Sequence, residues 1–219
     1  MRFRIDLKII LFIILFYFTK QINIYAMIMF FAIVHELGHL LAGCLLGMKP
    51  EKIEIMPYGV SVAFKLTPKD YNKKIKYGNQ LELKKILVAT AGPFINILII
   101  ILVLHMKMNF FGALMVLYSN LLLILFNLLP IYPLDGGRII KGILHIFLGK
   151  RKAEKYTNYI SFITLIIVTF IFSIVIYKAE NIAMFLIVLV LWGIFIREDR
   201  IYEKRNKIYN LLEKTIEIN

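Results

Sequence analysis

The chain contains a single cysteine and few acidic residues. Cys44 is the single cysteine among 219 residues, so an intrachain disulfide is excluded. Asp and Glu number 14 against 27 Lys and Arg, which gives a formal net charge of +13. The basic residues are spread over the connections between apolar segments, and this favours contact with lipid head groups over nucleic acid. We therefore expect the lipid bilayer as a partner and no nucleic acid.

Internal repeats and a signal-peptide cleavage site are also lacking. The N-terminus resembles a signal peptide, because it carries Arg2, Arg4 and a short apolar run. No small-residue cleavage site follows this run. We expect a retained first membrane helix.

Apolar residues are abundant. They make up 60% of the chain, with 17 Phe, and the mean hydropathy is +0.75. This composition predicts an all-α polytopic membrane protein with about six transmembrane helices. One membrane domain over residues 1–196 and a cytosolic amphipathic tail over residues 197–219 are expected. The hydrophobic segments cover residues 5–19, 22–48, 86–105, 110–130, 157–177 and 181–196.

The distribution of positive charge predicts the orientation in the membrane. All Lys and Arg residues except Lys20, Lys107 and Lys178 fall at the two termini and in alternate connections. The positive-inside rule therefore places both termini in the cytosol. Residues 22–48 then run from the outside to the cytosol, so their second half lies nearer the cytosolic face of the cell membrane.

The connection over residues 49–85 predicts a short β-hairpin. Ile53, Ile55, Val60, Val62 and Phe64 alternate with other residues around the turn Met56-Pro57-Tyr58-Gly59. One interpretation is a strand edge that receives an extended substrate, with Tyr58 and Gly59 as substrate-binding candidates. The alternative is an amphipathic loop on the membrane surface. Residues 65–85 are expected to be a solvated, Lys-rich linker.

The sequence His35-Glu36-Leu37-Gly38-His39 lies inside the apolar run of residues 22–48. Positions i and i+4 share one face of a helix, so both imidazoles can bind one metal ion. Glu36 can reach a water on that metal and act as the catalytic base. This is the HExxH arrangement of zinc hydrolases. The alternative is a His–Glu pair that joins two helices by hydrogen bonds.

The end of the fourth segment carries a second polar cluster, from Asn127 to Arg138. A catalytic zinc site needs a third protein ligand, and Asp135 is the candidate. As a bare pattern, Asp135 before Gly136 and Gly137 fits a turn equally well, so spacing leaves both interpretations open. Asn96, at membrane depth, is expected to form an interhelical hydrogen bond or to contact substrate.

The two clusters together resemble the site-2 protease family of intramembrane zinc metalloproteases. That family pairs HExxH with a motif of the type N-x-x-P-x-x-x-D-G, which is similar to Asn127, Pro130, Asp135 and Gly136 here. The resemblance implies that His35, His39 and Asp135 bind zinc, that Glu36 is the general base and that Asn127 positions substrate.

Met56 to Gly59, Leu129 to Gly137 and the basic tail resemble the stage IV sporulation protein FB branch. This resemblance implies cleavage of the pro-segment of a membrane-associated sigma factor. The setting would be the mother-cell membrane around the forespore, under the control of inhibitory membrane partners. Relatives carry a C-terminal nucleotide-binding domain, and the sequence ends at Asn219 without it, so ATP sensing through that domain is not expected.

Two other functions use the same residues. A zinc or proton transporter could pass its cargo along the buried His and Glu, but no inverted-repeat pattern is present. An inactive membrane scaffold would have lost a ligand or the base, and the motifs lack neither. We expect peptide hydrolysis inside the membrane.

Overall fold

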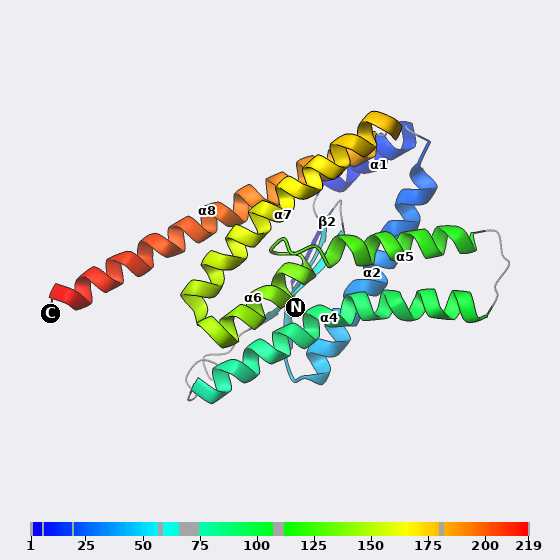
Figure 1. Ribbon diagram of the computed structural model, residues 1–219. Helices are drawn as coiled ribbons and strands as arrows, with labels where there is room; N and C mark the ends of the chain where they lie inside the picture. Colours follow the sequence, from blue (N-terminus) through cyan, green and yellow to red (C-terminus); the bar gives the residue numbers. More distant parts are fainter. Residues whose placement is uncertain are drawn as a thin grey trace. The chain divides into compact units, whose positions relative to one another are not determined.

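The computed structural model describes residues 2–5, 7–18, 20–56, 59–65, 75–106, 112–179 and 182–218. It contains two compact units, Met1–Leu128 and Leu129–Asn219, which are described separately below. The described residues form seven helices and three strands (Figure 1).

In the residues that the structure describes, the first unit combines four helices with a small sheet. In chain order its elements are β1 (Arg2–Ile5), α1 (Lys8–Phe18), α2 (Ile22–Leu45), β2 (Lys49–Met56), β3 (Gly59–Lys65), α4 (Ile75–His105) and α5 (Ala113–Asn127).

The sheet has the strand order β1-β2-β3. β2 and β3 are antiparallel, with Ile53 opposite Val62, and this confirms the predicted hairpin. β1 is parallel to β2, with Phe3 opposite Ile53. The sequence did not reveal β1, because its four residues precede an apolar helix and its partner is far along the chain. Tyr58 lies outside the described residues, whereas Gly59 begins β3.

Helix α2 packs closely on α4 at a glycine. A Cβ built on Gly38 would lie 3.0 Å from the carbonyl oxygen of Ala91 and 2.7 Å from Cδ1 of Ile95. Only a residue without a side chain allows this approach. In the N-terminal half of α2, Phe31 and Ala32 form a core cluster with Val116 and Leu123 of α5.

Helix α4 begins earlier than expected. The described part of the connection forms helix from Ile75, so the linker predicted over residues 65–85 is wrong from residue 75 onward. The lysines of this segment had indicated a solvated linker, but in the structure they make specific contacts from the helix. Lys84 donates a hydrogen bond to the carbonyl oxygen of Leu46 (2.8 Å) at the end of α2. Lys85 pairs with Glu82 one turn away (2.7 Å).

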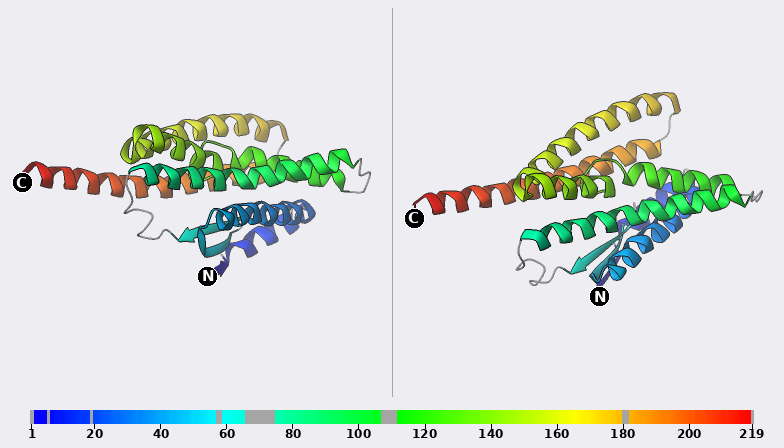
Figure 2. Two further views of the ribbon diagram at one scale, coloured as in Figure 1. Left: turned by 90° about the horizontal axis from the view of Figure 1, so that it is seen from below. Right: turned by 60° about the horizontal axis from the view of Figure 1, so that its bottom comes forward.

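The second unit consists of α6 (Asp135–Leu148), α7 (Lys150–Ala179) and α8 (Ile182–Ile218). α7 and α8 are antiparallel, and α6 packs on α7 (Figure 2). Leu165 and Leu191 are fully buried between the long helices, and Asn158 donates to Asp199 across them (2.7 Å). The sequence analysis missed α6, because its Arg138 and Lys141 were read as loop charges.

The long helices expose apolar faces. α2, residues Asn79–His105 of α4 and residues Lys150–Val175 of α7 are long and apolar enough to cross a membrane, and α5 is apolar but shorter. Their exposed large side chains include Phe30, Phe94, Ile101, Ile167 and Phe170. Such faces suit lipid and not water. The predicted polytopic helical membrane protein is confirmed.

The contact at Gly38 leads to a stability prediction. Gly38→Ala should lower the apparent melting temperature in detergent, with a loss of about 1–3 kcal/mol, because α4 must move away from α2. Gly193→Ala in α8 is the matched control, since a Cβ there meets nothing within 4 Å. Equal melting temperatures for the two variants would contradict this account of the α2–α4 contact.

Candidate metal centre

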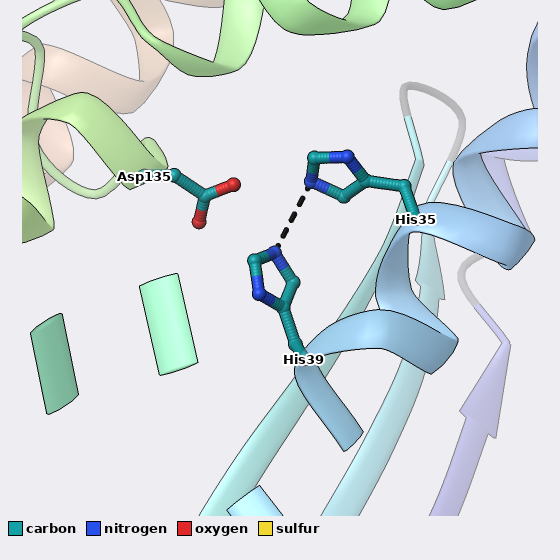
Figure 3. A group of neighbouring side chains, drawn as sticks. All are labelled: His35, His39 and Asp135. Atoms are coloured by element: carbon teal, nitrogen blue, oxygen red, sulfur yellow. Dashed lines mark hydrogen bonds between the residues drawn. The ribbon is translucent and has the colours of Figure 1, made fainter. Parts of the chain in front are cut away.

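Two histidines project from successive turns of α2 toward the same point (Figure 3). The side chains of His35 and His39 are 4% and 2% exposed. Their Nε2 atoms lie 3.1 Å apart. Two nitrogens bound to one tetrahedral zinc at about 2.0–2.1 Å lie about 3.3 Å apart, so this spacing suits a shared metal ion.

The outer nitrogens of both rings are held by α4. Nδ1 of His39 lies 2.6 Å from the carbonyl oxygen of Val88, and Nδ1 of His35 lies 2.8 Å from Oδ1 of Asn96. Both oxygens accept, so each Nδ1 carries the proton and each Nε2 keeps its lone pair. Two facing lone pairs repel unless a proton or a cation lies between them. The hydrogen bonds thus prepare both rings for a metal.

The backbone of α4 closes one side of this point at Gly92. A Cβ built there would lie 2.5 Å from Nε2 of His35 and 2.5 Å from Nε2 of His39. Any larger residue would occupy the space that a metal ion bound to the two imidazoles requires. Glycine at residue 92 therefore has a specific steric role beside the imidazoles, and the residues present fit a metal ion.

Glu36 lies beside the histidines with its two carboxylate oxygens in different surroundings. Oε1 accepts a hydrogen bond from the backbone N–H of Val62 in β3. Oε2 lies 3.9 Å from Nε2 of His39. That distance is too long for a direct hydrogen bond and leaves room for a bridging water. Glu36 is 7% exposed, so its carboxylate is placed to act on a buried water.

Asp135 belongs to the second unit. It is the first residue of α6, it is 4% exposed, and Nη1 of Arg138 lies 3.8 Å from its Oδ1. An acidic residue in the first turn also suits the helix dipole, so the position has a structural reason of its own. Figure 3 draws its carboxylate together with the two imidazoles.

The other predicted site residues occupy different positions. Asn96 is fully buried and makes an interhelical hydrogen bond, to His35. Asn127 ends α5 and donates to the carbonyl oxygen of Leu123 in the preceding turn (3.0 Å). Substrate contacts by Asn96, Asn127, Tyr58 and Gly59 stay predictions.

Three groups at the site escaped the sequence analysis. The carbonyl of Val88 and the amide of Val62 are backbone atoms, which no sequence motif distinguishes. In the sequence, Gly92 and Pro93 predict a bend and the close approach of a neighbouring helix, but not contact of Gly92 with the imidazoles. Its spacing of four residues from Asn96, one helical turn, was the available signal that both face α2.

Comparison with known proteins identifies the family. The family model described as Peptidase family M50 matches residues 23–112 and 104–171, which include the histidine helix and Asp135. The chain belongs to Peptidase family M50. This confirms the predicted site-2 protease family, whereas the sporulation branch within it stays a prediction.

A curated protein and a solved structure, both from Methanocaldococcus jannaschii, are similar to this M50 chain. Zinc metalloprotease MJ0392 is 29% identical over 191 residues, which cover 84% of this chain and 51% of the relative. The chain thus spans about half the length of that curated relative. A solved structure, the site-2 protease from the same organism, gives a TM-score of 0.63 at 23% identity and covers 89% of this chain and 88% of the other. It shows the same fold.

The family and its relatives agree with the chemistry expected from the motif. They support a metalloprotease and confirm zinc, at the level of the family, as the expected cofactor. The family assignment and the apolar helices together indicate a multi-pass membrane protein.

Gly92→Ala should abolish zinc binding, because the new methyl group would occupy the space between the two Nε2 atoms. Zinc content of the purified protein, measured by elemental analysis, checks this. Gly193→Ala is the control with the same chemical change in open space. Full zinc content in Gly92→Ala would mean that the metal binds elsewhere.

Asn96→Ala should weaken zinc binding about 10- to 100-fold, because His35 loses the partner that fixes its ring. Asn120→Ala is a matched control. Asn120 is equally buried, but its amide donates to the carbonyl oxygen of Val116 in its own helix. Competition with a chromophoric chelator gives both affinities, and an equal loss in the two variants would refute a specific role for Asn96.

Proposed function

We propose that this chain is an intramembrane zinc metalloprotease that cleaves a membrane-associated protein near the cytosolic face. The observation that carries the proposal is the convergence of two buried imidazoles beside the carboxylate of Glu36. The Nε2 atoms are 3.1 Å apart, and Glu36 lies 3.9 Å from one of them. A base at this distance suits a water-activating role.

We assign the three zinc ligands to His35, His39 and Asp135. Asp135 is buried and offers a carboxylate oxygen, a usual zinc ligand, which supports the third assignment. The family motif on which the resemblance rests also includes this residue. Carboxylate oxygen with two imidazole nitrogens is an established catalytic zinc ligand set that leaves one position open.

The chain's own residues transfer the proton and orient the imidazole rings. A bound zinc ion supplies Lewis acidity, which polarises a carbonyl oxygen and lowers the pKa of a water molecule to about 7. Glu36 takes the proton of the attacking water and hands it to the leaving amine. Val88 and Asn96 hold the imidazole rings in orientation, and the buried setting strengthens these electrostatic effects.

The edge of β3 is the proposed substrate track. β3 is an outer strand of the sheet, and its Val62 amide points to Glu36. A peptide added to this edge would run beside the base. Gly59 begins the same strand. We propose that Tyr58 and Gly59 contact the entering peptide and that Asn127 and Asn96 help to position it.

The proposed natural substrate is the pro-segment of a sporulation sigma factor, in the membrane around the forespore. The motifs that resemble those of the sporulation branch support it, as does the basic tail. We propose that both termini are cytosolic and that inhibitory membrane proteins restrain the enzyme.

Glu36→Gln tests the mechanism. It should keep about wild-type zinc and lose about 10²- to 10⁴-fold in the rate of peptide cleavage, because only the proton transfer is removed. Asp135→Ala should lose zinc as well as activity. The assay follows cleavage of a membrane-tethered pro-sigma segment in detergent by gel electrophoresis, with Glu203→Gln, an exposed residue of α8, as the control.

Three outcomes separate the alternatives. Unchanged cleavage in Glu36→Gln would refute the assigned base. Zinc flux into vesicles without cleavage would favour a transporter, and a folded protein with neither zinc nor activity would favour a scaffold. Cleavage of another tethered peptide but not of the pro-sigma segment would leave the protease and remove the sporulation substrate.

A further inference from the structure

A charge network around one buried carboxylate joins the three helices of the second unit. The carboxylate of Glu154 in α7 is 5% exposed and accepts a hydrogen bond from Nη1 of Arg205 in α8 (3.0 Å). Nζ of Lys141 in α6 lies 3.9 Å from the same oxygen. A buried carboxylate without such partners would be strongly disfavoured. One acidic side chain therefore fixes three helices relative to one another.

The same network reaches the segment before Asp135. Nζ of Lys141 lies 4.2 Å from the centre of the Tyr132 ring, a cation–π distance. The backbone N–H of Tyr132 donates to Oγ of Ser161 in α7 (3.0 Å), and Ser161 is 1% exposed. Burial raises the pKa of the Tyr132 hydroxyl, so the ring stays neutral beneath the ammonium group. Tyr132 is thus held from both α6 and α7.

The first turn of α6 packs directly against the backbone of Ile131 and Tyr132. A Cβ built on Gly137 would lie 2.4 Å from the backbone nitrogen of Tyr132 and 2.6 Å from the carbonyl oxygen of Ile131. Ile131 is fully buried, and its carbonyl oxygen accepts from the N–H of Leu134 (2.8 Å). The turn that begins with Asp135 therefore cannot move without moving Tyr132.

The cavity beside this network is too small for a ligand. It is lined by residues of all three helices, among them Thr157, Asn158 and Tyr202, and holds about 20 Å³. That volume accommodates about one water molecule. The cluster is consequently better explained as a support than as a binding site.

We propose that Glu154 and Ser161 are positioning residues that hold the Tyr132–Asp135 segment in place for metal binding. The inference rests on the proposed function, in which Asp135 is the third zinc ligand. Residues that orient ligands typically change metal affinity about 10- to 100-fold when they are removed. Neither residue needs to touch the metal or the substrate.

The test compares five proteins: wild type, Glu154→Gln, Ser161→Ala, Asp135→Ala and Glu203→Gln. Glu203→Gln is the matched control, since it removes one acidic charge from an exposed position of α8. Zinc affinity is measured by chelator competition, together with the visible spectrum of the cobalt-loaded protein and the melting temperature. Glu154→Gln and Ser161→Ala should each weaken zinc at least about tenfold and shift the cobalt bands.

The spectrum separates positioning from plain stability. A merely structural role would lower the melting temperature and leave the spectrum of the loaded protein unchanged, which would overturn the proposal. If Glu154→Gln does not fold, Ser161→Ala decides, because it removes only one hydroxyl group. Loss of zinc in Asp135→Ala with wild-type affinity in Ser161→Ala refutes the positioning role alone. Wild-type zinc affinity in Asp135→Ala refutes the ligand assignment and the positioning role with it.

Discussion

Burial of ionisable groups among apolar helices is the constraint on which the first unit depends. An imidazole or a carboxylate inside a membrane helix is costly unless every polar atom finds a partner. His35, Glu36 and His39 find theirs on two different elements, α4 and β3. The close approach of α4 to α2 and the position of β3 against α2 supply the hydrogen-bond partners of these polar groups.

Small residues make that approach possible. Gly38 brings α2 to the backbone of α4, and Gly92 brings α4 to the imidazoles. Gly43 does the same for the sheet, since a Cβ there would lie 2.2 Å from the ring of Phe64 in β3. Without water in the hydrocarbon region to fill a gap, the distance between elements decides whether a hydrogen bond exists.

The sequence predicted the parts of this protein whose signal is local. The HExxH motif identifies its own face of a helix, and the alternation from Ile53 to Phe64 identifies the hairpin. Parts that depend on distant partners were not predicted, such as the parallel pairing of β1 and the carbonyl of Val88. Helix α6 was not predicted for another reason: Lys141 faces a buried carboxylate on α7, but in the sequence it resembles a solvent-exposed charge.

The parallel pairing of β1 with β2 has a consequence for the order in which the chain assembles. β1 is made first, but its partner follows only after α1 and α2. Parallel strands require such a long crossover, and here the crossover contains the histidine helix. The three-stranded sheet can therefore form only once that helix has been synthesised, and the pairing of β1 then joins the N-terminus to a strand that follows His35, Glu36 and His39 in the chain.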